Sequence, residues 1–565
     1  MRRLAIAIAF LLMLAPLVIA RNPAQKPAQI PRIRVATRLV QVGVIVRDKN
    51  GPVANLTKDD FVVLDRGKPQ KISVFSVQSG SPAAQPAQSQ SQAALQPLPP
   101  NTFSDLPQYA APPRSVTIVL LDNLNTLYGS VAESKYEESP YWLEDLALKN
   151  AKDHLIQFIQ QLQPQDRVAI YGLRHSLRVV CDFTSDRAQL LAILKNYDTT
   201  SITKRQVVEP GKTMIITGGH DNPMADIFGQ ASEFENGASL HLAGAANKDR
   251  ALETMSALEA IAAHVANIPG RKNLVWLTAN LPFSGAEMAR VLSPSDVAVY
   301  PIDARGLLAQ SPMVLADIPG TADADDVSGA SGHMDNMPAQ SSQPIGIATM
   351  QKVAEDTGGH AFVNTNDLTG AIRKAVEDSA VTYTLGFYIN SDALDGKFHE
   401  IKVKVRPKGL SVRYPKGYFA FPDTAPTQNA DQQMVETAVQ SPIESSMIPL
   451  QATFERASQP RPNSLNLVCR IDVQNIQFAR SAGLRKGAIA IYVIGQNAAG
   501  KVLHNWEKTY NLQFTDAQYS SLLRSGIPFR QSLELRPDVT TLRIVVEDTA
   551  VARTGSLIIP LSQIN

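Results

Sequence analysis

Continuous apolar runs alternate with amphipathic stretches through the middle of the chain. The run Arg114 to Leu124, RSVTIVLLDNL, is rich in aliphatic and β-branched residues and contains Asp122 near its end. A strand buried on both faces of a parallel sheet has such a continuous apolar pattern. The next stretch has apolar residues at three- and four-residue steps, which predicts a helix. Its apolar positions are Leu148, Ala151, Leu155, Phe158, Ile159 and Leu162.

The same alternation continues to about residue 381 and predicts an α/β domain with a mainly parallel sheet and helices on both faces. Strands are expected to start near Val116, Val168, Leu274 and Val297. Because an open parallel sheet binds ligands beyond the carboxyl ends of its strands, Asp122 is a candidate site residue.

Shorter runs of alternating apolar residues flank this domain and predict antiparallel strands. In residues 33–78 the apolar positions change phase at Leu39-Val40, which predicts a bulge or a break between two strands. Residues 382–421 contain further short strands. Since neither part has enough strands for a stable sheet, we expect the two parts to pair, with the α/β domain inserted between them.

The last part of the chain has short strands at regular spacing, which is typical of a β-sandwich. The predicted fold class is therefore α/β and β multi-domain: a doubly wound parallel sheet inserted in a small β domain, followed by a C-terminal β-sandwich. At 565 residues the chain has room for about three or four domains. We expect a signal peptide (1–20), a Pro-rich tether (21–32), a split β domain (33–78 and 382–421), a flexible linker (79–113), the α/β domain (114–381) with surface insertions at 200–248 and 306–345, a second linker (422–440) and the sandwich (441–565).

The N-terminus predicts export. Arg2 and Arg3 precede an apolar run from Leu4 to Ile19, and small residues follow at the position of a cleavage site near Ala20. We expect a cleaved signal peptide and a periplasmic, envelope-associated or secreted protein; an uncleaved anchor is the alternative. No later segment approaches the length of an apolar membrane span.

Charge and cysteine content exclude two classes of protein. The net charge is +2, and the basic residues are scattered among acids, so nothing favours a nucleic-acid partner. Cys181 and Cys469 fall in different expected domains, which excludes a disulfide-stapled fold. We expect two separately buried thiols, with one long-range bridge as the open alternative.

Several segments resemble one family. They are KNGPVANLTKDDFVVLDRGKPQKISVF, LLDNLNT, PGRKNLVWLT, AEDTGGHAFVNTNDLTGAI, YTLGFY and VRYPKGYFA. In this order they resemble the VWFA-related proteins first described in acidobacteria, over about residues 33–421. The resemblance implies a von Willebrand factor A (VWA) like domain that recognises another protein.

The resemblance also implies a divalent-cation site, built from an Asp-x-Ser-x-Ser loop, a Thr in a second loop and an Asp in a third. Asp122 and Thr126 match the first and fifth positions, but Leu124 replaces the first Ser and Ala279 the third-loop Asp. Since Mg²⁺ needs an octahedron of oxygens, this degenerate motif leaves too few ligands. We therefore expect no metal cofactor, with Mg or Ca binding as the alternative. The candidates for the second-loop Thr are Thr199 and Thr200.

A structural role for the same loop is the favoured interpretation. The side chains of Asp122, Asn123, Asn125 and Thr126 are ligand-binding candidates, yet such residues also cap helices and hold loops by side-chain hydrogen bonds. The acidic run at Asp323, Asp325 and Asp326 lacks the spacing of a calcium loop and is expected to be solvated.

The chain carries none of the common enzyme signatures. It has no Gly-x-Ser-x-Gly, no phosphate-binding Gly-rich loop and no His-Glu-x-x-His; the pair His399-Glu400 lacks the second His. We expect no catalytic residues.

Three hypotheses on function remain. The leading one is an exported, non-enzymatic adhesion or scaffolding protein that binds another protein or a cell-envelope component. The second is a hydrolase or other enzyme acting on envelope polymers, with His220 and Asp221 or acids of the long insertions as its residues. The third is a structural spacer with a VWA remnant that binds nothing.

Overall fold

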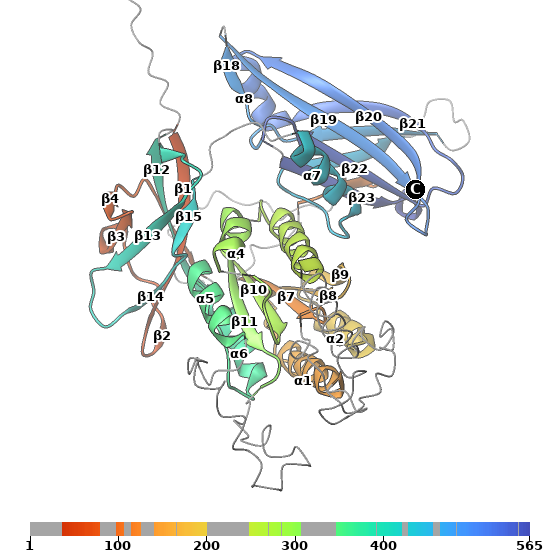
Figure 1. Cartoon of the computed structure of the whole chain (residues 1–565). Helices are drawn as coiled ribbons and strands as arrows, with labels where there is room; N and C mark the ends of the chain where they lie inside the picture. Colours follow the sequence, from red (N-terminus) through yellow and green to blue (C-terminus); the bar gives the residue numbers. More distant parts are fainter. Residues whose placement is uncertain are drawn as a thin grey trace, which may run out of the picture.

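The structure is a computed structural model in which three bodies can be distinguished: the split β domain, the α/β domain and the C-terminal β domain (Figure 1). The expected signal peptide, the tether and nearly all of the two long insertions lie outside the described residues. The structure describes residues 37–79, 98–106, 115–125, 141–164, 166–199, 248–268, 270–283, 285–306, 346–390, 393–420, 428–455, 464–481, 483–551 and 553–564.

The α/β domain is built on a five-stranded sheet of order β11-β10-β7-β8-β9. The first four strands of this order are parallel, and β9 is an antiparallel edge strand. The prediction that strands near Val116, Val168, Leu274 and Val297 are neighbours in one sheet is confirmed. The strands are β7 (Ser115–Asp122), β8 (Asp166–Leu173), β9 (Leu177–Thr184), β10 (Lys272–Thr278) and β11 (Val297–Asp303).

Helices cover both faces of this sheet, as the alternating pattern predicts. One apolar core lies under α1 (Tyr141–Ile159), α2 (Arg187–Asn196) and α6 (Leu368–Glu377). A second core lies under α4 (Gly285–Leu292), α5 (Ile347–Thr357) and a helix over residues 248–264. Strands buried between two helical layers need apolar side chains on both sides, which explains their continuous apolar runs.

Local capping fixes the helix ends. The Asp186 side chain accepts hydrogen bonds from two backbone N–H groups of the first turn of α2. The Asp367 side chain accepts one such hydrogen bond in the first turn of α6. At the end of α5, Gly358 adopts a left-handed conformation (φ 76°) and returns its N–H to the last turn. Short 3-10 turns complete the helical elements: η1 (Lys58–Asp60), η4 (Ser293–Ser295), η7 (Asp378–Ala380) and η9 (Leu561–Gln563).

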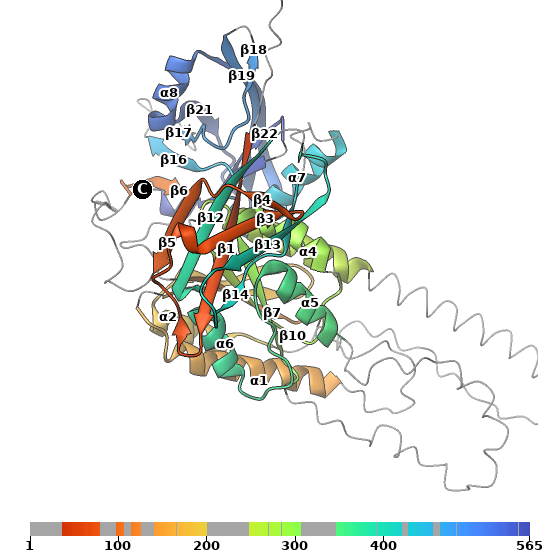
Figure 2. The same cartoon turned by 90° about the vertical axis from the view of Figure 1, so that its left-hand side faces the viewer.

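The two parts of the split β domain share both of its sheets, whose strands can be followed in Figure 2. One sheet has the order β14-β1-β12-β5 with β2 beside β1, and the other has the order β15-β13-β3-β4. A single apolar core lies between them. The N-terminal part supplies β1 (Thr37–Asp48), β2 (Gly51–Pro52), β3 (Phe61–Asp65), β4 (Lys68–Gln70) and β5 (Val74–Ser79), and the later part supplies β12 (Val381–Asn390), β13 (Phe398–Val405), β14 (Ser411–Arg413) and β15 (Gly417–Phe419).

The bulge or break expected at Leu39-Val40 is wrong. β1 pairs with β12 from Thr37↔Asn390 to Val44↔Tyr383 without a register shift. The change of phase has another cause, because the outer face of β1 is also covered: Ile45 is fully buried, and a Cβ added at Gly43 would lie 2.8 Å from the Asp296 carboxylate of the α/β domain.

The C-terminal domain is a β-sandwich. Its sheets have the orders β21-β17-β16-β6 and β18-β19-β22-β23, with β20 beside β19, and one apolar core draws side chains from both. Cys469 is buried in this core and Cys181 in the α/β domain, and both are free. The elements are β16 (Leu450–Glu455), β17 (Ser464–Ile471), β18 (Ala479–Ser481), β19 (Leu484–Gln496), β20 (Val502–Phe514), α8 (Asp516–Ser525), β21 (Ile527–Glu534), β22 (Thr541–Asp548) and β23 (Arg553–Pro560).

Two ranges expected to be linkers contain regular elements. Within 79–113, β6 (Thr102–Ser104) pairs with β16 and so joins the sandwich. Within 422–440, α7 (Gln428–Gln440) contacts β22 and β23. β6 has only three residues in a Pro-rich range, and α7 is a mostly polar helix. Neither has a periodic apolar pattern, so the sequence does not predict them and only their tertiary contacts show them. None of the helices described is long and apolar enough to cross a membrane.

Candidate functional site

The carboxyl edge of the parallel sheet gathers the polar residues that the sequence singled out. The register places Asp122 at the end of β7 opposite Leu173 of β8, and pairs Thr278 at the end of β10 with Asp303 of β11. Asp122 is fully buried. Its position at this edge agrees with the prediction from the apolar run.

Hydrogen bonds from Leu124, Asn125 and Trp276 occupy both oxygens of the Asp122 carboxylate. Oδ1 accepts from the backbone N–H groups of Leu124 (3.0 Å) and Asn125 (2.9 Å). Oδ2 accepts from the Asn125 side-chain amide (3.0 Å) and from the indole Nε1 of Trp276 on β10 (2.8 Å). Burial raises the pKa of the Asp122 carboxyl, although the hydrogen bonds from Asn125 and Trp276 oppose the shift. The carboxylate therefore connects the loop after β7 to the neighbouring strand β10.

This arrangement does not fit the divalent-cation site that the family resemblance implies. A bound Mg²⁺ needs carboxylate lone pairs directed at the ion. Here both oxygens of Asp122 face N–H donors instead, and the neighbouring Leu124 side chain packs against the apolar core. At the third-loop position Ala279 is buried. In the part of the chain that the structure describes, no group of three His, Cys, Asp or Glu side chains is placed to hold a metal.

The other candidate residues of this loop also make structural contacts. The side-chain amide of Asn123 donates to the backbone carbonyl of Thr199 (2.9 Å). Asn125 donates to the hydroxyl of Thr254 (2.9 Å), which in turn donates to the Arg250 carbonyl (2.7 Å). These bonds connect the β7 loop to the ends of two helices. Thr126 and Thr200 lie outside the described residues, as do His220, Asp221 and the acidic run at Asp323, Asp325 and Asp326.

A second buried acid stands at the same edge. Asp303 is 1% exposed and pairs with Arg305, whose Nε and Nη2 lie 2.8 Å from its two oxygens. Two parallel contacts of this kind form a bidentate ion pair, which fixes the loop geometry. The edge thus presents two carboxylates that each stabilise their own loop.

The segment PGRKN at the start of β10 joins the α/β domain to the split β domain. The buried Arg271 donates through Nη1 to the Gly43 carbonyl of β1 (3.2 Å) and through Nη2 to the Gly358 carbonyl (2.5 Å). Burial lowers the pKa of the next residue, Lys272, to about 8, and Asp296 partly opposes this. Asn273 donates to the Ala375 carbonyl at the end of α6 (2.7 Å). This segment therefore has a structural role.

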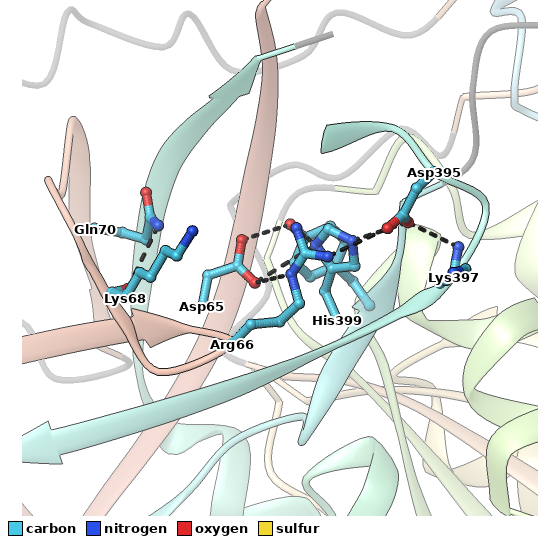
Figure 3. Close-up of polar contacts among 8 residues, drawn as sticks. Asp65, Arg66, Lys68, Gln70, Asp395, Lys397 and His399 are labelled. Atoms are coloured by element: carbon cyan, nitrogen blue, oxygen red, sulfur yellow. Dashed lines mark hydrogen bonds and ion pairs between the residues drawn. The ribbon is translucent and has the colours of Figure 1, made fainter. Parts of the chain in front are cut away.

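Sequence reasoning missed a buried polar cluster in the split β domain, shown in Figure 3. His399 on β13 is fully buried and lies 3.0 Å from Asp395 through Nε2 and 3.0 Å from the Tyr418 hydroxyl through Nδ1. Tyr418 donates to Oδ2 of Asp65 on β3 (3.0 Å). At the rim, Arg66 pairs with Asp395 (3.2 Å). The signal in the sequence was a His at an inward position of an alternating strand.

The cluster connects residues from the two separated parts of the domain. Asp65 and Arg66 come from the part before the α/β insertion, and the other members come from the part after it. Burial and the Asp65 carboxylate raise the pKa of the Tyr418 hydroxyl, which therefore stays a neutral donor. The backbone N–H of Lys397, with help from His399, lowers the pKa of Asp395. These five residues, Asp65, Arg66, Asp395, His399 and Tyr418, form a hydrogen-bonded cluster that joins the two parts of the domain and is called the clasp below.

Comparisons with known proteins found only distant likenesses to solved structures. No family model matches the sequence, and no curated protein matches it. One solved structure with some likeness is an aerotolerance-related membrane protein from Bacteroides fragilis, at 12% identity and a TM-score of 0.23, over 46% of this chain and 98% of that one. BatB from Bacteroides thetaiotaomicron matches at 13% identity and a TM-score of 0.23, over 47% of this chain and 98% of that one. The pilus adhesin SpaC from Lactobacillus rhamnosus GG matches at 7% identity and a TM-score of 0.23, over 79% of this chain and 53% of that one. Likenesses this distant carry no argument on function. The mainly parallel sheet with helices on both faces fits the core of a VWA-like domain.

Proposed function

We propose that this chain is an exported, non-enzymatic binding protein, an adhesin or scaffold. In this proposal its VWA-like domain recognises another protein or a cell-envelope component at the carboxyl edge of the sheet, without a metal ion. The family resemblance of residues 33–421 suggests the class of function. Fold analogy alone would be a weak argument, so the proposal needs support from the edge itself.

The supporting observation is that three long segments leave the described chain at this one edge. The residues that flank them are Asn125 after β7, Thr199 beside Asn123, and Gly306 after β11. The segments are residues 126–140, 200–247 and 307–345. Binding surfaces are often carried by loops on a rigid scaffold. The bonds of Asp122 and the Asp303–Arg305 pair supply that rigidity on the scaffold side.

The experiment is partner capture from envelope extracts with the immobilised chain from residue 21 to 565. Three arms are compared: the wild type, the wild type in EDTA, and a variant in which residues 309–343 are replaced by a Gly/Ser segment of equal length. We expect the same partner with and without EDTA, and loss of the partner in the replacement variant. The matched control replaces Glu507, an exposed residue of β20 in the sandwich, by Gln and should capture normally.

Three outcomes would overturn the proposal. Capture that EDTA abolishes would show that a cation bridges the partner. Release of soluble fragments from purified envelope polymers by the wild type, but not by a His220→Ala variant, would favour the hydrolase hypothesis. Equal capture by the replacement variant would place the binding surface elsewhere on the chain.

A further inference from the structure

A pocket of about 340 Å³ lies between the α/β domain and the C-terminal sandwich. The α/β domain contributes Arg167 of β8, residues 182–185 at the end of β9, and His264. The sandwich side contributes residues 104–106 at the end of β6, and Glu444 ahead of β16. Pockets between domains are common ligand sites, and this one contains several ionisable side chains.

The α/β side of the pocket is an ordered His–Asp pair with an aromatic wall. Nε2 of the buried His264 lies 3.4 Å from Asp182, and its Nδ1 lies 2.7 Å from the Glu444 carbonyl. Burial opposes a charge on this ring, but Asp182 and Glu444 outweigh burial and raise the pKa of His264. Phe183 stacks on the imidazole with the rings 5° from parallel. Asp182 therefore stabilises the protonated form of His264.

The sandwich side holds an acid with an unused acceptor. Asp105 is 3% exposed, and its Oδ1 accepts from the Leu450 backbone N–H at 2.9 Å. Its Oδ2 is buried without a hydrogen-bond partner among the described residues. A buried acceptor left unsatisfied costs free energy, so this atom requires an explanation. A donor from a bound molecule supplies one.

Glu444 is a second carboxyl on the same side. Its Oε1 accepts from the Ile558 backbone N–H (2.8 Å), and no basic side chain of the described chain lies within ion-pair distance of it or of Asp105. Burial raises the pKa of Glu444 to about 7, and burial, with a smaller contribution from Glu444, raises the pKa of Asp105 well above its usual value. The charge of Glu444 thus makes ionisation of Asp105 less favourable.

We propose that this pocket binds a primary ammonium group on a short alkyl chain, with Asp105 and Glu444 as its acceptors and Phe183 beside its chain. An ammonium has three N–H donors, enough for the free Oδ2 of Asp105 and for Glu444 together. The aromatic face of Phe183 also attracts a cation. Arg167 also lines the pocket, from the α/β side, and its Nη1 donates to the Pro164 carbonyl (3.0 Å).

A metal ion fits this pocket less well than an ammonium. The described carboxylates and His264 do not converge as a metal-ligand set. An alkyl ammonium needs only hydrogen-bond distances to two acceptors and tolerates a wider pocket. The ammonium can belong to a free diamine or to a lysine side chain, and the two sources can be separated by experiment.

The test is calorimetric titration of the full chain from residue 21 at pH 8 with 1,4-diaminobutane. Its neutral isostere 1,4-butanediol is titrated in parallel, and Nα-acetyl-lysine methylamide represents a lysine side chain. We expect one site for the diamine and no binding of the diol. Binding of the lysine analogue as tight as that of the diamine assigns the site to a protein lysine; weaker binding assigns it to a free amine. A diol that binds as well as the diamine overturns the proposal, as does a diamine that gives no saturable heat.

Two isosteric variants localise the site. Asp105→Asn keeps an oxygen for the Leu450 N–H, and Glu444→Gln keeps one for the Ile558 N–H, so both retain the bonds that hold the backbone. Each should raise the dissociation constant of the diamine at least tenfold. The control Asp59→Asn, at an exposed position of the split β domain, should change it less than twofold. Unchanged binding in both pocket variants would show that the amine binds elsewhere.

Diamine binding by the wild type at two pH values tests the proposal without any substitution. Glu444 faces Asp182 and His264 of the α/β domain, Asp105 of the β6 segment and Arg543 of β22. Since protonation of Glu444 below its pKa of about 7 removes a charge that attracts the ammonium, the wild type should bind the diamine at least tenfold more weakly at pH 5 than at pH 8. Equal affinity at the two pH values would contradict the proposal.

Discussion

The indole Nε1 of Trp276 donates a hydrogen bond of 2.8 Å to Oδ2 of Asp122, although the two residues are 154 positions apart in the chain. The bond joins the end of β7 to β10 in the interior of the α/β domain. It uses an acceptor that a metal-binding VWA-like loop would direct at a cation. The hydrogen bond from Trp276 thus occupies the Asp122 oxygen that would be expected to bind a cation.

Replacing Trp276 by Phe should destabilise the α/β domain. The change leaves the buried Asp122 oxygen without its indole donor, which costs about 1 to 3 kcal/mol. Differential scanning calorimetry of the chain from residue 21 measures the loss as a lowered unfolding midpoint. Trp506→Phe, at a half-buried position of the sandwich, is the control for loss of indole area alone. An equal effect of both substitutions would argue that the hydrogen bond contributes nothing.

Divalent cations should bind weakly or not at all near Asp122. Leu124 and Ala279 provide no oxygen ligands from their side chains, and the Asp122 oxygens face N–H donors. Calorimetric titration with Mg²⁺, Mn²⁺ and Ca²⁺ should show no stoichiometric site. A site of micromolar affinity that vanishes in Asp122→Ala would contradict this and would mean that a residue outside the described chain completes the shell.

The clasp around His399 should stabilise the split β domain. In His399→Leu the Asp65 carboxylate stays buried without the imidazole, and we expect a loss of about 2 to 4 kcal/mol. Tyr418→Phe should cost about 1 kcal/mol. Because the two residues share one hydrogen bond, the double variant should lose less than the sum of the single losses. Denaturant unfolding measures these values, with His175→Leu in the exposed β8–β9 turn as the control; strict additivity would refute the coupling.

Ionisation of Glu444 should destabilise the folded chain as the pH rises to neutral. Its pKa is raised from 4.5 to about 7 in the folded state, so the folded state holds the proton more tightly than the unfolded state. Stability then falls as the pH rises from about 4.5 to 7, and the penalty is complete above pH 7. At ~1.4 kcal/mol per pKa unit, the free energy of unfolding falls by at most about 3 kcal/mol.

Glu444→Gln removes this penalty and keeps the acceptor for Ile558. The variant should unfold at a higher temperature than the wild type at pH 8 and at the same temperature at pH 4.5. Thermal unfolding across this pH range is the measurement. A gain in stability of the same size at both ends of the range would show that ionisation of Glu444 is not its cause.

The sequence by itself determined the local elements and their class. The apolar run from Val116 to Leu121 and the three- and four-residue steps of α1 are set by which faces each element must bury, so their pattern is visible along the chain. The caps at Asp186 and Gly358 act within one helical turn and are local for the same reason. The pairing of the split β domain followed because neither part could form a stable sheet alone.

Only the tertiary structure decided what the polar residues do. Whether Asp122 holds a loop or a cation depends on Trp276, and the role of His399 depends on Asp65, which the α/β insertion separates from it. The amphipathic helix containing His264 predicts only a buried face, while its partners Asp182 and Glu444 come from two other domain segments. Hydrogen bonds between residues far apart in sequence leave no periodic signal, because they depend on the distance between two side chains after folding.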